Sequence, residues 1–190
     1  MKRKIRLQRG TPNNLKLEEF EVEVETGMVV LDAIHRIQAT DAPDLAVRWN
    51  CKAGKCGSCS AEINGEPGLT CMTRLSDYPE DETLTVQPMK TFPLIKDLVT
   101  DVSWNYEVNK RIQPYQHTET DDDPIMFQKE VDRVQEFRKC IECFLCQDVC
   151  HVLRSHDMKQ EFAGPRFMIR NAGLEMHPLD QGDRLEYIRS

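Results

Sequence analysis

The chain has 190 residues, of which 39% are hydrophobic and 30% charged, and its formal net charge is −7. This length allows one large domain or two small ones, and the composition is not that of a disordered protein. No uncharged stretch reaches the roughly 18 apolar residues of a membrane helix, so we expect no direct membrane span. No apolar run follows the basic start, which disfavours a signal peptide. A pI near 5.3 disfavours non-specific nucleic-acid binding.

Alternating apolar and polar residues predict two strands of a hairpin over residues 4–9 and 17–25, with turn residues at 10–14 between them. A helix is expected over roughly residues 28–38, where apolar residues recur on one side, and Thr26 is its expected N-cap. The first part of the chain therefore begins with a strand pair and one helix.

A first group of four cysteines follows this helix, with the spacing C-x4-C-x2-C and a fourth cysteine further on: Cys51, Cys56, Cys59 and Cys71. That spacing is typical of plant-type [2Fe–2S] ferredoxins. Gly54 and Gly57 allow the loop to curl around a cluster and bring amides close to the sulfurs. The alternative is a structural zinc site, although zinc prefers two C-x2-4-C pairs. The fourth cysteine comes after a turn-like segment at residues 64–68.

A short strand expected near residues 83–87 completes a small α+β domain. Residues 113–128 are polar and acidic, and we interpret them as part of an extended interdomain connection. Helical periodicity returns from Pro124 to about Lys139 and again from Gly164 to Ser190, so the second half is predicted to be all-α.

A second group of cysteines has the spacing C-x2-C-x2-C-x3-C and consists of Cys140, Cys143, Cys146 and Cys150. This is the run of bacterial ferredoxins, in which three thiolates hold one [4Fe–4S] cluster and the fourth binds a different cluster. Three cysteines cannot complete a cubane, so further ligands are required. No cysteine follows Cys150 in this sequence.

The pairing of these two groups resembles the iron–sulfur subunits of succinate dehydrogenase and fumarate reductase over essentially the whole chain. The resemblance rests on these segments: Cys51-Lys-Ala-Gly-Lys-Cys56-Gly-Ser-Cys59-Ser-Ala-Glu-Ile-Asn-Gly65, Thr70-Cys71, Phe92-Pro-Leu-Ile-Lys-Asp-Leu98, Arg111-Ile-Gln-Pro114, Cys140-Ile-Glu-Cys143 and Gly164-Pro165.

The resemblance implies an N-terminal β-grasp [2Fe–2S] ferredoxin domain over residues 1–103, a connection over 104–128, and an incomplete helical ferredoxin domain over 129–190. It assigns the first cysteine group to [2Fe–2S]. It assigns Cys140, Cys143 and Cys146 to [4Fe–4S], and Cys150 to [3Fe–4S].

Two departures from the family pattern affect these expectations. The family has a further cysteine group ending in C-x3-C-P, which this chain lacks, and the uncapped helical sequence at 183–190 indicates truncation. Ubiquinone-using members often carry proline and tryptophans directly after the fourth cysteine, whereas His151 and Val152 stand here. Menaquinone is therefore the expected quinone.

The expected function is one-electron transfer from FAD in a flavoprotein subunit to membrane quinone, as part of a succinate:quinone oxidoreductase. No residue has a claim to substrate chemistry, so no catalytic residue is assigned. The resemblance implies a flavoprotein partner and a membrane-anchor partner, and a peripheral location on the cytoplasmic face of the membrane. The alternatives are a subunit of a quinol:fumarate reductase or a related dehydrogenase, and a zinc-binding structural adaptor.

Overall fold

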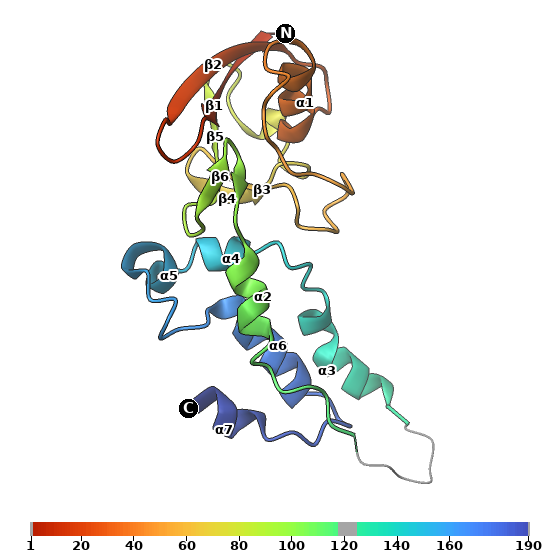
Figure 1. The fold of residues 1–190 in the computed structure, drawn as a ribbon. Helices are drawn as coiled ribbons and strands as arrows, with labels where there is room; N and C mark the ends of the chain where they lie inside the picture. The colour runs from red at the N-terminus through yellow and green to blue at the C-terminus, as the bar shows by residue number, and fades with distance from the viewer. Residues whose placement is uncertain (1, 118–124, 190) are drawn as a thin grey trace. The chain divides into compact units, whose positions relative to one another are not determined.

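A computed structural model describes residues 2–117 and 125–189 of the chain (Figure 1). It divides into two compact units. The first unit contains Met1–Val102 together with Ile141–Asp157, and the second contains Ser103–Cys140 together with Met158–Ser190. The domain division at residues 103 and 128 stays a prediction from the sequence.

A five-stranded mixed sheet in the order β2-β1-β5-β3-β4 forms the framework of the first unit. Strands β1 and β5 run parallel, and the other neighbours are antiparallel. The strands are β1 (Lys2–Arg9), β2 (Lys16–Glu23), β3 (Ser60–Ile63), β4 (Glu66–Leu69) and β5 (Leu84–Gln87). The predicted hairpin is confirmed, and the predicted strand near residue 83 is β5.

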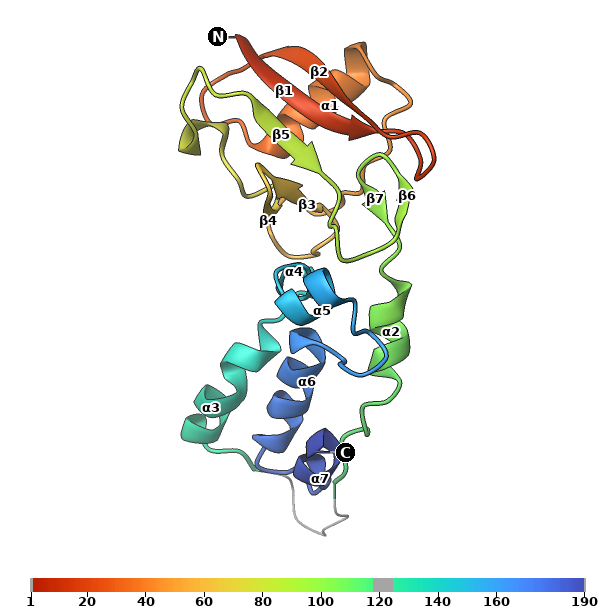
Figure 2. The ribbon, with the colours of Figure 1, turned by 90° about the vertical axis from the view of Figure 1, so that its left-hand side faces the viewer.

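Helix α1 (Val30–Thr40) packs against one face of this sheet (Figure 2). Its buried side chains join those of the strands in one apolar core that includes Ile5, Leu7, Val22, Ile34, Ile37, Ile63, Leu84 and Val86. Strands and a helix around one core make the unit α+β, as the sequence predicts.

The predicted N-cap of helix α1 is wrong. Val29, not Thr26, occupies that position, and its backbone N–H donates to the Asp32 carboxylate at 3.1 Å. Asp32, three residues after the N-cap, thus accepts from one of the free amides at the start of the helix, which is the task expected of Thr26.

Two short helices from the second cysteine group belong to the first unit, α4 (Leu145–Asp148) and α5 (His151–His156). Phe144, at the N-cap of α4, is buried and its ring meets that of Phe92 edge-on. This aromatic pair anchors the start of α4 to the segment that follows the sheet.

The loops at one end of the first unit converge on the buried carboxylate of Asp97. This residue lies in the turn between β6 (Leu94–Lys96) and β7 (Val99–Thr100). Its two oxygens accept from the backbone N–H groups of Gly10, at 2.6 Å, and Ala46, at 2.8 Å. One side chain thus connects the hairpin turn, the segment before the first cysteine group and the β6–β7 turn. A single turn of 3-10 helix lies at Leu75–Asp77.

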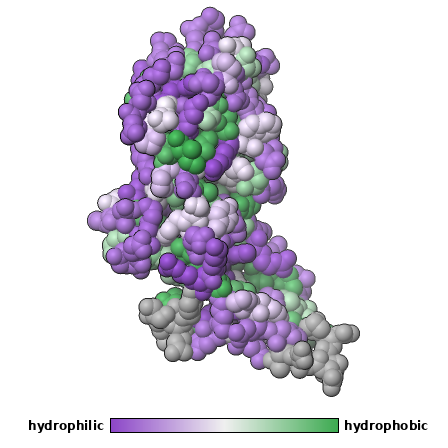
Figure 3. Space-filling model, in the orientation of Figure 1, coloured by the Kyte–Doolittle hydropathy of each residue, from purple (hydrophilic) through white to green (hydrophobic). Residues whose placement is uncertain are grey.

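The described part of the second unit contains only helices: α2 (Ser103–Asn109), α3 (Gln128–Arg138), α6 (Pro165–Glu175) and α7 (Arg184–Arg189). Helix α3 falls within the predicted helix from Pro124 to Lys139, although Pro124 itself lies outside the described residues. No helix in the described ranges is both long enough and apolar enough to cross a membrane. Hydrophilic side chains cover most of the face in Figure 3.

A buried ion pair between Asp180 and Arg184 stabilises the second unit. Arg184 donates to the Asp180 carboxylate at 2.8 Å and to the carbonyls of Gln113 and Pro114. The backbone N–H of Gln116 also donates to Asp180, at 2.9 Å. Burial by itself raises the pKa of the Asp180 carboxyl, but these donors outweigh burial, so the pKa lies below its usual range.

We expect Asp180→Asn to destabilise the chain by about 1–3 kcal/mol at pH 7, since hydrogen bonds to a charged group are lost. A carboxyl whose pKa falls on folding adds stability above its unfolded pKa of about 3.9, and this stability disappears as the pH drops through the folded value. Urea midpoints of wild type and variant should therefore differ at pH 7 and converge as the pH falls through the folded pKa of Asp180.

The exposed i,i+3 pair Glu136–Lys139 supplies the control. Glu136→Gln should change the urea midpoint far less than Asp180→Asn at pH 7. A gap between wild type and Asp180→Asn that stays constant from pH 7 to pH 3 would contradict the assignment.

Candidate iron–sulfur site

The first cysteine group lies on a loop between α1 and β3 whose backbone turns sharply. Lys52, Gly54 and Gly57 all have positive φ angles, of 53°, 63° and 68°. The turns direct two backbone N–H groups, those of Ala53 and Lys55, at the Cys51 sulfur, at 3.4 and 3.3 Å. Amides aimed at a sulfur stabilise a thiolate and the negative charge of an iron–sulfur cluster.

The cysteines of this group affect one another's ionisation. The Ser58 hydroxyl, followed by the backbone amides of Cys51 and Ser58, lowers the pKa of the Cys56 thiol to about 6. Burial, followed by the neighbouring Cys59 side chain and the charge of Cys51, raises the pKa of the Cys71 thiol. The structure therefore brings the four predicted residues together, and at Cys56 it favours the thiolate form that binds iron.

Strand pairing brings the fourth cysteine to the loop. Strands β3 and β4 are joined by a tight turn in which Asn64 and Gly65 both have positive φ, as a type I′ hairpin requires. The buried Thr70 then donates from its backbone N–H and its hydroxyl to the Cys59 carbonyl, at 3.2 and 3.0 Å. These bonds fix Cys71 beside Cys59, and both cysteines pack on Leu31 of α1. The turn predicted over residues 64–68 is confirmed at Asn64 and Gly65, whereas residues 66–68 belong to β4.

Charged and aromatic side chains of α1 flank the loop. The Lys52 ammonium lies 3.1 Å from the Asp32 carboxylate and 5.8 Å from the centre of the Trp49 ring. The His35 ring meets Trp49 edge-on, and burial, followed by the Lys52 charge, lowers the pKa of His35. The positive charge next to Cys51 is therefore paired with a carboxylate, and His35 is neutral at pH 7.

The second cysteine group is divided between the two units. Cys143, Cys146 and Cys150 belong to the first unit, whereas Cys140 is the last residue of the first segment of the second unit. All eight cysteines are free thiols. Among the described residues, no set of three or more His, Cys, Asp or Glu side chains has the arrangement of a bound metal ion.

Sequence patterns missed the residues that connect the two groups within the first unit. The Ser60 hydroxyl lies 2.8 Å from the carbonyl oxygens of both Gly57 and Cys143. The backbone of Gly57 approaches Cys143 so closely that a Cβ at position 57 would lie 2.6 Å from the Cys143 Cα. These contacts join positions more than 80 residues apart, so no local signal could have indicated them.

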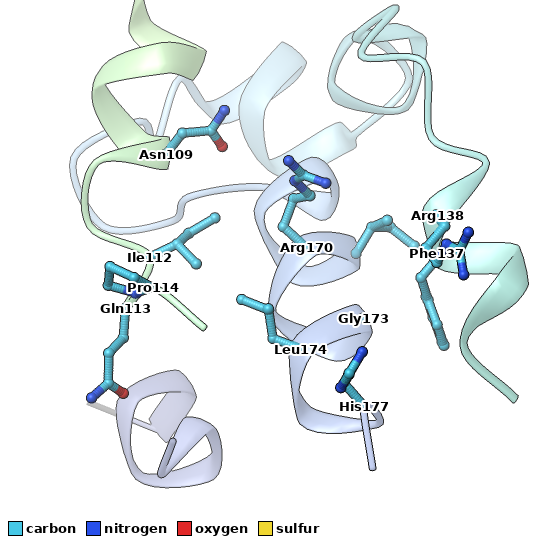
Figure 4. A pocket seen from close by; sticks show the side chains of 11 residues that line it. Asn109, Ile112, Gln113, Pro114, Phe137, Arg138, Arg170, Gly173, Leu174 and His177 are labelled. Carbon is cyan, nitrogen blue, oxygen red and sulfur yellow. The ribbon is translucent and has the colours of Figure 1, made fainter. Parts of the chain in front are cut away.

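A cavity of about 370 Å³ lies within the second unit (Figure 4). Its walls come from the segment after α2, from α3 and from α6, with Ile112, Phe137 and Leu174 among its apolar side chains and Arg138 and Arg170 among its polar ones. None of the cysteines lines it. The candidate site is therefore the pair of cysteine groups and not this cavity.

Comparison with known proteins agrees with the geometry of the first cysteine group. A family model described as a 2Fe-2S iron-sulfur cluster binding domain matches residues 4–107. The fumarate reductase iron-sulfur subunit of Wolinella succinogenes is 30% identical over 176 residues, which cover 90% of this chain and 72% of that protein. The corresponding subunit of Mycobacterium tuberculosis is 32% identical over 170 residues, covering 87% and 67%.

A solved structure is similar along nearly the whole chain. A chain of the Mycobacterium smegmatis Sdh1 complex in the apo form matches with a TM-score of 0.95 and 57% sequence identity, covering 99% of this chain and 80% of that chain. With its paired cysteine groups and its mixed sheet, the chain therefore belongs to the family of iron–sulfur subunits of succinate dehydrogenase and fumarate reductase.

Proposed function

We propose that this chain carries single electrons from a reduced flavin in a partner flavoprotein to quinone at a membrane-anchor subunit of a succinate:quinone oxidoreductase. The observation that carries the proposal is the first cysteine loop, where the four cysteines affect one another's ionisation and two amides point at the Cys51 sulfur. In this proposal Cys51, Cys56, Cys59 and Cys71 hold a [2Fe–2S] cluster. A cluster in this loop would accept and release one electron at a time and would take no part in bond chemistry on a substrate.

The second cysteine group extends the path for electrons. We assign Cys140, Cys143 and Cys146 to three corners of a [4Fe–4S] cluster and Cys150 to a [3Fe–4S] cluster, following the rule that the last cysteine of such a run binds a different cluster. Both clusters need ligands beyond these eight cysteines. In this proposal the second cysteine group belongs to a helical ferredoxin domain, and the N-terminal domain is a β-grasp.

The partners and location follow from the same family. A flavoprotein with FAD would dock beside the [2Fe–2S] domain, and an anchor subunit with menaquinone would receive the electrons at the cytoplasmic face of the membrane. Fumarate reduction by a quinol is the alternative direction, and it is favoured by the fumarate reductase names of the relatives.

Iron loading tests the first part of this proposal. Wild-type protein reconstituted with iron and sulfide should turn brown and, after reduction, give the rhombic EPR signal of a [2Fe–2S] cluster. Cys59→Ala should remove this signal, because alanine offers no atom that can bind iron in place of the buried thiolate. Cys150→Ala is the matched control and should leave the signal in place. A wild-type protein that binds zinc and no iron would refute the proposal.

Electron delivery tests the second part. Succinate added together with the purified flavoprotein partner should reduce the [2Fe–2S] cluster of wild-type protein. Succinate without that partner should not reduce it, because in this proposal the flavin of the partner oxidises succinate.

A further inference from the structure

Four charged side chains of the first unit meet where α4 and α5 lie next to β3. We call Glu62, Lys90, Asp148 and Arg154 the Glu62 cluster. Glu62 and Asp148 are fully buried, whereas Arg154 is a quarter exposed and Lys90 half exposed. Glu62 lies on β3, directly after the first cysteine loop, whereas Asp148 and Arg154 come from α4 and α5.

Within the Glu62 cluster, Arg154 and Lys90 bind the two oxygens of Glu62 at short distances. Arg154 donates to one Glu62 oxygen at 2.6 Å and to the Asp148 carbonyl at 3.1 Å, and Lys90 lies 2.9 Å from the other Glu62 oxygen. Burial raises the pKa of the Glu62 carboxyl, but Arg154 and Lys90 lower it by more than burial raises it. Glu62 is therefore ionised at neutral pH. The backbone N–H of Thr91 donates to Asp148 at 3.0 Å.

Two uncharged contacts act on the same segment. The Ser60 hydroxyl reaches the Cys143 carbonyl at 2.8 Å, and the Gly57 backbone packs directly on Cys143. The first cysteine loop and the segment with Cys143, Cys146 and Cys150 are therefore joined at three points within one unit: Gly57, Ser60 and Glu62.

A buried charge is costly unless it is paired, so a buried cluster of this kind constrains geometry more than it adds net stability. Electron exchange between two centres depends steeply on their separation. A side-chain arrangement that fixes one cysteine group against the other therefore sets a quantity on which electron transfer depends.

We propose that Glu62 and Arg154 are positioning residues, which hold the segment with Cys143, Cys146 and Cys150 at a fixed distance from the [2Fe–2S] loop and so set electron transfer between the two centres. Only the effect on electron transfer rests on the proposed function. The attachment of α4 and α5 through Glu62 and Arg154 requires no bound cluster. One electron leaves the first centre as the second centre gains it, with the reduced flavin as donor and quinone as final acceptor.

Amide hydrogen exchange of the full chain tests the attachment. Arg154→Gln removes the cation between two buried carboxylates and should speed exchange in α4 and α5 by about tenfold or more, while β1 and β2 stay protected. Arg154→Lys should restore part of the protection. Arg6→Gln, which breaks the exposed pair of Arg6 with Glu19, is the control and should change nothing in α4 and α5. Unchanged exchange in Arg154→Gln would overturn the proposal.

EPR of the assembled complex, in which ligands beyond these eight cysteines complete the second centre, tests the positioning role. When both centres are reduced, the second should shorten the spin relaxation of the [2Fe–2S] signal. Arg154→Gln should lose this effect at an unchanged [2Fe–2S] content, and Arg154→Lys should regain part of it. Faster exchange with unchanged relaxation would mean a merely structural role and would overturn the proposal.

The two measurements also separate this proposal from the proposed function. A wild-type protein without iron–sulfur signals would refute the function, and hydrogen exchange would still decide the attachment. If Arg154→Gln also exposes β1 and β2, the isosteric Glu62→Gln takes its place with the same two outcomes.

Discussion

Replacement of Gly57 by alanine is expected to lower the free energy of unfolding by about 2–5 kcal/mol, from left-handed strain and overpacking together. Gly57 has φ of 68°, where a side chain is strained. An added Cβ would also lie 2.6 Å from the Cys143 Cα and 2.8 Å from its nitrogen. Both neighbouring atoms belong to the backbone, so they cannot move aside as the end of a flexible side chain could. Urea denaturation followed by circular dichroism measures the loss.

Gly65 provides a matched control for this experiment. Its φ is 85°, but a Cβ there would meet no atom within 4 Å. Gly65→Ala should therefore cost only the backbone strain, about 1–2 kcal/mol. The difference between the two variants measures the contact with Cys143. Equal losses at positions 57 and 65 would show that the first cysteine loop does not pack on the second group.

The second large effect is expected at Asp97, whose buried carboxylate accepts from the amides of Gly10 and Ala46. Asp97→Ala leaves both amides without their acceptor and places alanine at a φ of 50°. At roughly 1–3 kcal/mol for each of the two unsatisfied amides, the total loss should reach about 2–6 kcal/mol. Thermal or urea unfolding checks this value.

A second variant at position 97 separates hydrogen bonding from charge, and a variant at Asp44 is the control. Asp97→Asn keeps one acceptor oxygen and tolerates positive φ, so it should recover part of the stability that Asp97→Ala loses. Asp44 pairs with Arg9 at 2.7 Å, but the Asp44 side chain is exposed. Asp44→Ala should therefore lower the free energy of unfolding much less than Asp97→Ala. A comparable loss in Asp44→Ala and Asp97→Ala would contradict the role given to the two amides.

Patterns that act over short stretches of sequence predicted much of the first unit. Alternation marked β1 and β2, and the C-x4-C-x2-C spacing marked a loop that must curl around a cluster. The turn at Asn64 and Gly65 was indicated by residues that tolerate positive φ. The prediction of Thr26 as the N-cap of α1 was wrong because local sequence does not fix the first residue of a helix to within one or two positions. In the fold, Val29 is the N-cap and its N–H donates to Asp32.

Contacts over long sequence distances could not be predicted in the same way. Glu62 stands between Ala61 and Ile63 in a short strand, where it looks like an ordinary polar residue, yet its partner Arg154 is 92 positions away. Ser60 likewise shows nothing in sequence of its contact with Cys143. Helices α2, α4 and α5 have seven residues or fewer, too short for a periodic signal. Packing across the fold determines these features.

The return of residues 141–157 to the first unit has a consequence for how the chain is made. The ribosome completes Met1–Val102 first and must then synthesise Ser103–Cys140 before α4 and α5 exist. At about 5–20 residues per second this leaves the nascent sheet for a few seconds with Glu62 lacking its arginine. We therefore expect the N-terminal part to be least protected from proteolysis at this stage of synthesis. Its protection should become complete once Arg154 has been synthesised and pairs with Glu62.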